Sequence, residues 1–364
     1  MKVSELISII EAEFPLWYQE DYDNSGLLIG QPDKEISSVL LCVDTTEDVI
    51  REAINKKAGL IISHHPVIFQ PLKKITTTSN TGRIILSAVQ HNIAIYCAHT
   101  NVDNLISGVN QKICQKLGLK NCRILAPQTG GLRKLVTYVP VNKADEVRAA
   151  LFEAGAGHIG NYDFCSFNVN GTGSFRAAKG THPYSGSVGE LHFEEETRIE
   201  TIFPAYLKEK IIAALLKAHP YEEVAYDIFI TENENFGAGA GMIGETADHA
   251  DEITFINTVK NTFKCKYVKY SALTGKKVKS VAVCGGSGSF LLNNAILAGA
   301  DVFITSDVKY HQFFDADKRI VLLDIGHFES EQFTIDIFYE ILIKKLPNFA
   351  IHFSTINTSP IYYL

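Results

Sequence analysis

The stretch Gly59-Leu60-Ile61-Ile62-Ser63-His64-His65-Pro66 decides how the rest of this chain is interpreted. Its apolar residues predict a buried strand, which must end near Pro66 because proline has no N–H to donate and restricts the residue before it. His64 and His65 therefore follow the carboxyl end of the strand, where open α/β sheets bind ligands. For this stretch alone, adjacent histidines indicate either a metal site or a pair of surface residues that cap a strand.

Two further predicted strand ends carry the same residue types. The apolar strand that ends at Ala98 is followed by His99 and Asp103. Another apolar strand leads to His327 and Glu331, which are four residues apart and would share one face of a helix. Taken alone, that pair is better explained as an exposed helical turn. In one parallel sheet, however, all three strand ends would open on the same edge.

The donor atoms at these strand ends are imidazole nitrogens and carboxylate oxygens, without cysteine. This set suits zinc, iron or manganese, and the absence of cysteine argues against a closed structural zinc site. A carboxylate that bridges two ions about 3.5–4 Å apart would make a two-metal hydrolytic centre. The sequence therefore predicts a metal site at one edge of a sheet.

The composition excludes several classes of protein. Hydrophobic residues make up 46% and charged residues 21% of the 364 residues, as in an ordinary globular protein. The net charge of −7 argues against a nucleic-acid-binding surface, and no apolar run approaches the length of a membrane span. The start of the chain has helical spacing rather than that of a signal peptide. The seven scattered cysteines favour a reducing cytoplasm over a disulfide framework.

The order of predicted elements divides the chain. Strands alternate with helices near both ends, which predicts an α/β domain with a mainly parallel sheet, built from residues 1–128 and 242–364. Between them, residues 132–235 have the order β-α-β-β-α-β of a ferredoxin-like domain, with one strand expected at 162–168. The glycine-rich stretch 236–241 is interpreted as the linker back to the α/β domain.

Two weaker patterns lie outside this set. The turn Gly285-Gly286-Ser287-Gly288-Ser289 opens a predicted helix and could hold a phosphate, although tight packing is the simpler reason for its glycines. The pairs His182-Pro183 and His219-Pro220 suggest a second metal site, but turn chemistry explains both better.

Together the motifs resemble one family, the GTP cyclohydrolase I type 2 homologues, also called the NGG-interacting-factor-three-like family. The motifs that carry this resemblance follow the family's order and occupy both ends of the chain: Asp23-Asn24-Ser25-Gly26-Leu27 with Gly30, Ser63-His64-His65-Pro66, His99-Thr100-Asn101-Val102-Asp103, and Gly326-His327 with Ser330-Glu331. The middle of the chain resembles the PII/CutA-like domain that is inserted in the longer bacterial members.

The resemblance implies a dinuclear centre with two divalent metal ions per subunit and with Glu331 as the bridging ligand. The ligands that it implies are His64, His65, Asp103, His327 and Glu331. His99 matches a residue near the metals and is expected beside the ligands or as a proton-transfer group. The resemblance also implies a toroidal homohexamer whose metal sites face an internal cavity.

Two hypotheses of function follow. The first is a metal-dependent hydrolase that acts on a nucleotide-like substrate, of which ring opening of GTP would be one case. The second is a metal-binding regulatory or ligand-sensing protein without catalysis, which the PII/CutA-like insertion favours. The expected partners are further copies of the chain and a small molecule or nucleotide, with neither a membrane nor a nucleic acid among them.

Overall fold

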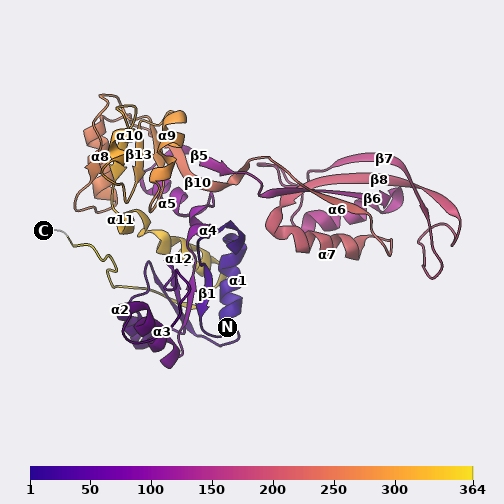
Figure 1. The fold of residues 1–364 in the computed structure, drawn as a ribbon, viewed down its shortest axis with the longest axis horizontal. Coiled ribbons are helices and arrows are strands. Elements are labelled where there is room, and N and C mark those ends of the chain that lie inside the picture. Colours follow the sequence, from indigo (N-terminus) through magenta and orange to yellow (C-terminus); the bar gives the residue numbers. More distant parts are fainter. Residues whose placement is uncertain (363) are drawn as a thin grey trace. The chain divides into compact units, whose positions relative to one another are not determined.

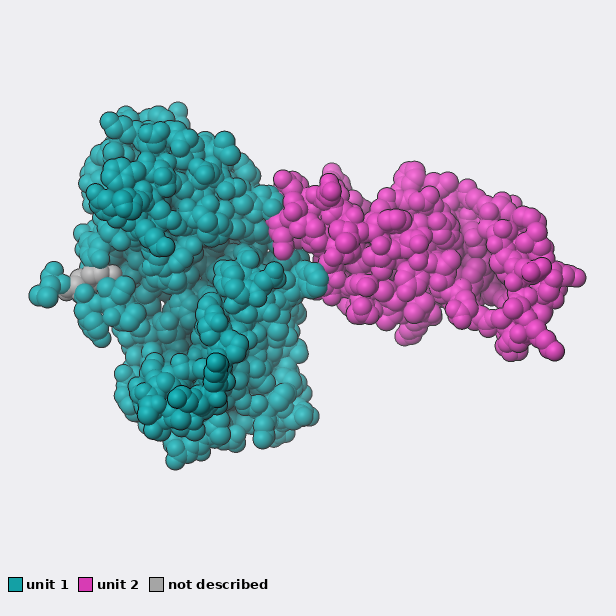
Figure 2. Space-filling view, viewed as in Figure 1, with its two compact units in different colours: residues 1–127, 237–364 teal, residues 128–236 magenta. Residues whose placement is uncertain are grey.

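The computed structural model describes residues 1–362 and 364, which form two compact units. Unit 1 comprises Met1–Pro127 and Gly237–Leu364, and unit 2 comprises Gln128–Phe236 (Figure 2). No helix in the described part of the chain is long and apolar enough to cross a membrane.

Unit 1 contains two separate sheets, so the prediction of one sheet was wrong. The first sheet has the strand order β1-β4-β3-β2-β15, with β1 antiparallel to β4 and the other strands parallel. Its strands are β1 (Gly26–Ile29), β2 (Ser38–Cys42), β3 (Leu60–Ser63), β4 (Ala94–Cys97) and β15 (Ala350–Phe353). Its helices are α1 (Val3–Glu13), α2 (Glu47–Asn55), α3 (Asn80–Gln90), α4 (Thr100–Asp103) and α5 (Val109–Lys116), with the 3-10 turn η1 (Leu16–Tyr18) after α1.

The second sheet has the order β11-β14-β13-β12-β10-β5. Strands β12, β13 and β14 are parallel to one another, while β10 and β11 pair antiparallel with β12 and β14. Its strands are β5 (Lys120–Gln128), β10 (Asn235–Glu245), β11 (Lys269–Tyr270), β12 (Ser280–Val283), β13 (Val302–Thr305) and β14 (Val321–Asp324). Between β10 and β15 the chain forms the helices α8 (Glu252–Thr262), α9 (Leu292–Leu297), α10 (Gln312–Asp315), α11 (His327–Glu331) and α12 (Thr334–Lys345), with the 3-10 turn η4 (Ser289–Leu291) before α9. Of these, α12 packs on β2 and β15 of the first sheet.

One hydrophobic core joins the inner faces of both sheets and includes side chains of α1, α5, α8 and α12. Alternate strand residues point to opposite faces. Leu41 of β2 therefore lies in this shared core, while Leu40 packs with α2 and α3 on the other face. Phe303 of β13 packs in the same way with α9 on the outer face of the second sheet. Burial on both faces explains why these strands read as continuous apolar runs.

The stretch 236–241 is part of β10 and not a linker, which corrects the sequence interpretation. Its glycines permit close packing of strands. A Cβ atom at Gly239 would lie 2.2 Å from the carbonyl oxygen of Ala126, so β5 and β10 approach each other too closely there for any side chain.

Unit 2 has the predicted order β-α-β-β-α-β, and its four antiparallel strands are arranged β7-β8-β6-β9. Helices α6 and α7 cover one face of this sheet (Figure 1) and form a separate core with it. The elements are β6 (Leu132–Pro140), η2 (Val141–Lys143), α6 (Ala144–Glu153), β7 (Phe167–Arg176), β8 (Leu191–Pro204), η3 (Ala205–Leu207), α7 (Lys208–Ala218) and β9 (Tyr226–Ile230).

Strand β7 corrects the expectation of a strand at 162–168. It begins at Phe167 and continues through Gly171 and Gly173. The pairing with β8 keeps these glycines in the ladder, since Gly171 lies opposite Glu196 and Gly173 opposite Glu194. Long-range pairing therefore overrides the weak strand propensity of glycine here.

Candidate metal centre

All five predicted ligand residues lie together, although they come from two sheets. His64 and His65 directly follow β3 of the first sheet, and Asp103 is the last residue of α4, the short helix after β4. His327 and Glu331 are the first and last residues of α11, which follows β14 of the second sheet. The strand-end argument thus identified the residues but assigned them to the wrong arrangement of strands.

The carboxylate of Glu331 lies at the centre of this cluster. Its Oε2 atom is 2.9 Å from Nε2 of His65, 3.1 Å from Nε2 of His327 and 3.7 Å from Nε2 of His64. Nε2 of His64 is also 3.6 Å from Oδ1 of Asp103. Two groups that could hold a metal ion therefore share Glu331, one completed by His65 and His327 and the other by His64 and Asp103.

The second nitrogen of each histidine is held by an oxygen outside the centre. The acceptors are the carbonyl of Ala98 for His64 at 3.0 Å, Asp44 for His65 at 2.7 Å, Asp23 for His99 at 2.7 Å and Asp307 for His327 at 2.6 Å. In each case the bonded atom is Nδ1, so Nε2 is left for the centre. Metal-binding histidines commonly have such carboxylate or carbonyl partners, which fix the tautomer and the ring orientation.

The sequence analysis missed two of these partners, Asp44 and Asp307, and treated Asp23 only as part of a motif. Asp44 and Asp307 lie just beyond the ends of β2 and β13. The criterion of a polar residue at the carboxyl end of a strand would therefore have found both. Hydroxyl groups hold these acids in turn, as Thr358 donates to Asp44 and Ser287 donates to Asp307.

The glycine turn before α9 makes room for Glu331. A Cβ atom at Gly286, where φ is +62°, would lie 2.3 Å from Oε1 of Glu331. The N–H groups of Gly285, Gly286 and Gly288 are already used, because their acceptors are Asn110, Ser330 and Thr305. These bonds favour close packing, the simpler explanation of the glycines, over a phosphate site.

The donor set fits a cation. Within the described part of the chain, Nε2 of His64, Oδ1 of Asp103 and Oε2 of Glu331 are buried without a hydrogen-bond partner. Buried polar atoms are rarely left unpaired because the loss of hydration is costly. These three atoms form one of the two candidate metal groups, and a single cation among them would satisfy all three.

Burial and neighbouring charges shift the pKa values of the side chains in this cluster. Burial and the charge of Glu331 raise the pKa of Asp103 well above its usual value. Burial raises the pKa of Glu331 too, but the surrounding imidazoles outweigh this effect and hold its pKa well below its usual value. Burial lowers the pKa of His65 and of His327, yet their carboxylate partners raise these pKa values to about 10 and about 9.

Comparison with known proteins decides the family. A family model described as Duf34/NIF3 (NGG1p interacting factor 3) matches residues 1–360. The chain belongs to the Duf34/NIF3 family. The resemblance inferred from the motifs is thereby confirmed.

Relatives in this family extend over nearly the whole chain. A protein of Halalkalibacterium halodurans is 43% identical over 324 residues, which are 88% of this chain and 87% of that one. A protein of Bacillus subtilis is 40% identical over 329 residues, covering 90% and 88% of the two chains. Both are named "GTP cyclohydrolase 1 type 2 homolog". The crystal structure of a Bacillus cereus protein related to NIF3 is 40% identical, with a TM-score of 0.88 and coverage of 100% of this chain and 99% of that one.

His99 of this Duf34/NIF3 chain lies beside the five predicted ligands. Its ring centroid is 5.3 Å from that of His64 and 5.4 Å from that of His65, and the three histidines form a further group that could hold a metal ion. On its other side the ring of Phe69 lies at 6.4 Å, and Phe69 is 6.4 Å from the ring of Tyr22. Both aromatic side chains are exposed, Tyr22 by 63% and Phe69 by 43%.

Proposed function

We propose that this Duf34/NIF3 protein is a metal-dependent hydrolase that binds two divalent cations per subunit, of zinc, iron or manganese. The observation that carries the proposal is the sharing of Glu331 by two candidate metal groups. In the proposal, His65 and His327 hold one ion, His64 and Asp103 hold the other, and Glu331 bridges them. Divalent ions in such a centre supply Lewis acidity, which activates water near neutral pH and polarises the bond under attack.

His99 is proposed to transfer the proton. The hydrogen bond from Nδ1 to Asp23 fixes the orientation of the ring, and Nε2 is then free to accept or donate a proton near the substrate. The backbone N–H of Thr100 also donates to Asp23, at 3.1 Å, so this carboxylate is itself held in place. Asp23 is thus a positioning residue in the proposal, because it acts on the substrate only through His99.

A nucleotide-like substrate is favoured by the exposed rings of Tyr22 and Phe69 next to His99. Aromatic side chains stack on the flat face of a base. The two loops that carry these rings are joined, since the side chain of Asn24 donates to the carbonyl of Ile68 at 2.6 Å. The name "GTP cyclohydrolase 1 type 2 homolog" of the bacterial relatives points to the same class of substrate.

The proposal also covers the cellular location and the oligomeric state of the protein. We propose a cytoplasmic protein, which agrees with the seven free cysteines, and a toroidal homohexamer in which unit 2 is a PII/CutA-like insertion. The second candidate function is a regulatory protein that senses a ligand without catalysis. Unit 2 favours it, because that unit contains a large cavity of its own.

The decisive experiment measures metal-dependent turnover on a panel of nucleotides, GTP among them, and phosphoesters. His99→Ala should lower turnover by about 10²–10⁴-fold, the usual contribution of general acid–base catalysis, while both metals stay bound. His65→Ala should lose metal and activity together. His91→Ala is the control, because this exposed histidine directly after α3 lies outside the cluster.

Three results would count against the proposal. Loss of metal in His99→Ala would make His99 a ligand and not a proton-transfer group. A lower melting temperature with unchanged turnover per metal-loaded subunit would give His99 a purely structural role. Absence of metal-dependent turnover on every compound of the panel would favour the regulatory function.

A further inference from the structure

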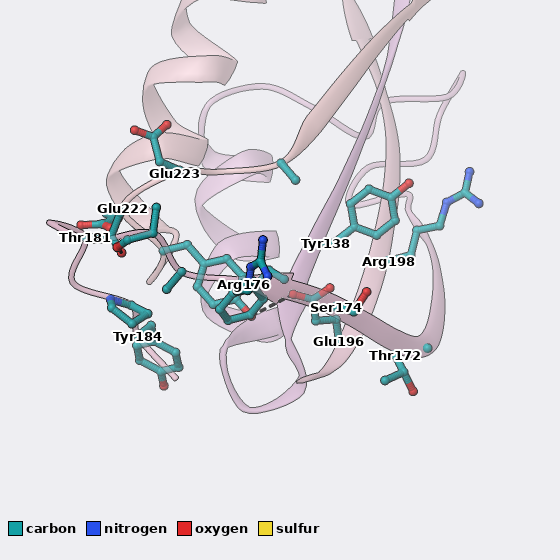
Figure 3. A pocket seen from close by; sticks show the side chains of 18 of the residues that line it. Tyr138, Thr172, Ser174, Arg176, Thr181, Tyr184, Glu196, Arg198, Glu222 and Glu223 are labelled. Carbon is teal, nitrogen blue, oxygen red and sulfur yellow. Dashed lines mark hydrogen bonds between the residues drawn. The ribbon is translucent and has the colours of Figure 1, made fainter. Parts of the chain in front are cut away.

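Unit 2 contains a cavity of about 730 Å³ that plays no part in the metal centre (Figure 3). Strands β7 and β8, the side chain of Tyr138 and the segment 221–225 line it. Gly171 and Gly173 contribute only backbone to its wall, and a Cβ atom at Gly171 would meet no atom within 4 Å. The absence of side chains at these positions is what leaves the space open.

A buried carboxylate faces this cavity. Glu196 is 9% exposed, and its Oε1 atom accepts a hydrogen bond of 2.8 Å from the hydroxyl of Tyr221. Among the residues that the structure describes, none donates a hydrogen bond to Oε2 or forms an ion pair with Glu196. Because Glu196 lines the cavity, its carboxylate can accept a charge-assisted hydrogen bond from a donor outside the chain.

Gly173 accommodates this carboxylate. A Cβ atom at Gly173 would lie only 2.2 Å from Oε2 of Glu196, so any other residue would displace the carboxylate. The backbone of Gly173 has no positive φ that would itself require glycine. The glycine is therefore explained by the position of Glu196.

Aromatic rings form the wall beside Glu196. The ring of Tyr221 lies 6.0 Å from the rings of Phe175 and of Tyr184. His219, which is 6% exposed, fixes this wall by accepting from the backbone N–H of Tyr221 at 3.1 Å and bonding the carbonyl of Tyr138 at 3.0 Å. The interpretation of His219-Pro220 as a turn agrees with these bonds, which use both ring nitrogens.

The charges that line the cavity favour a cationic ligand. Glu222 and Glu223 line it together with Glu196. Arg198 also lines it but is paired with Glu200 at 2.7 Å. Arg176 lines it too and, like Glu222 and Glu223, is exposed, so the three carboxylates of the lining outnumber this arginine. A carboxylate beside aromatic faces is the arrangement that attracts ammonium groups, through the charge of the acid and the negative face of the rings.

We propose that this cavity binds a small organic ammonium compound. Its ammonium group lies on Oε2 of Glu196, and its aromatic or apolar body lies against Phe175, Tyr184 and Tyr221. The site lies wholly within unit 2 and does not depend on the metals or on the proposed hydrolase activity. It gives the insertion a ligand class of its own.

Titration calorimetry on the full-length chain with matched probes tests the proposal. Tryptamine and phenethylamine carry an ammonium group, whereas indole-3-propionate and 3-phenylpropionate carry a carboxylate on the same rings. Both amines should bind, and each acid should bind at least about 10-fold more weakly, since a charge-assisted hydrogen bond is replaced by repulsion from Glu196. Equal or tighter binding of the acids, or no binding of either amine, would overturn the proposal.

Variants of β7 and β8 assign the binding to Glu196. Glu196→Gln should weaken tryptamine binding by about 10–100-fold. Gly173→Ala keeps the charge but displaces the carboxylate, and it should weaken binding in the same direction. Glu195→Gln is the matched control, because this exposed neighbour on β8 does not line the cavity and should leave the affinity unchanged.

A purely structural role of Glu196 predicts a different outcome. Glu196→Gln would then lower the melting temperature through the lost hydrogen bond of Tyr221, and its affinity for tryptamine would equal that of the unaltered chain. If Glu196→Gln does not fold, the Gly173→Ala variant tests the site instead. This variant should fold, because the flexible end of the Glu196 side chain can move away from the added methyl group. Unchanged tryptamine affinity in a folded Gly173→Ala variant would reject the site.

Discussion

The candidate metal centre of unit 1 and the cavity of unit 2 each contain a buried carboxylate, but the neighbours of the two acids differ. Glu331 is 2% exposed and its Oε2 faces three imidazole nitrogens. Glu196 is 9% exposed and its neighbours are a phenol hydroxyl and aromatic rings. Imidazole and carboxylate together bind metal ions, whereas aromatic faces and carboxylate bind organic cations. The neighbours of a buried acid therefore predict which kind of cation it binds.

Of the changes considered, replacement of Glu331 should have the largest effect on metal content. Glu331→Gln removes the one charge shared by both candidate metal groups, so we expect both ions to be lost. Elemental analysis of metal per chain measures this loss, and Glu196→Gln is the matched control, with unchanged metal content. Retention of one ion by Glu331→Gln would mean that the carboxylate does not bridge.

The acids behind the histidines should have a smaller effect. Asp44→Asn and Asp307→Asn leave all five proposed ligands in place but weaken the orientation of His65 and His327. Metal affinity should fall by about 10–100-fold, as expected for partners of ligating histidines. Competition with a chromogenic chelator measures the affinity, and Asp48→Asn on the exposed face of α2 is the control. If both variants bind metal as tightly as the control, Asp44 and Asp307 do not contribute to metal binding.

Removal of unit 2 should have the smallest effect on the metal centre. Strands β5 and β10 are neighbours in one sheet, and Gly239 lies against Ala126, so a short Gly/Ser linker can replace residues 128–236. We expect the shortened chain to fold and to hold the same metal content, while tryptamine binding disappears. An insoluble or metal-free product would show that the two units depend on each other.

The residues of the candidate metal cluster could be found from the sequence because they follow strand ends that are easy to recognise. His64, His65, His327 and Glu331 each stand at or near a change from an apolar run to polar residues. The same reasoning could not tell that β3 and β14 belong to different sheets, because strand pairing is set by long-range packing. The polar strand β5 was missed for a related reason, since its pairing with β10 and not its composition makes it a strand.

The cavity of unit 2 could not be predicted from local pattern. Glu196 lies among other acidic residues of β8, and Gly173 lies in a stretch rich in glycine and serine. Only the register of β7 against β8 brings the two together, and only the turn after α7 brings Tyr221 to Glu196. Residues that are brought together by strand register show no recognisable spacing in the sequence, whereas residues that follow strand ends do.

The most direct test of the central proposal is elemental analysis of the unaltered chain, expressed and purified without a chelator. We predict two divalent ions of zinc, iron or manganese per chain, retained through gel filtration. One ion per chain would contradict the bridging arrangement at Glu331, and the absence of any stoichiometric metal would contradict the metal centre itself.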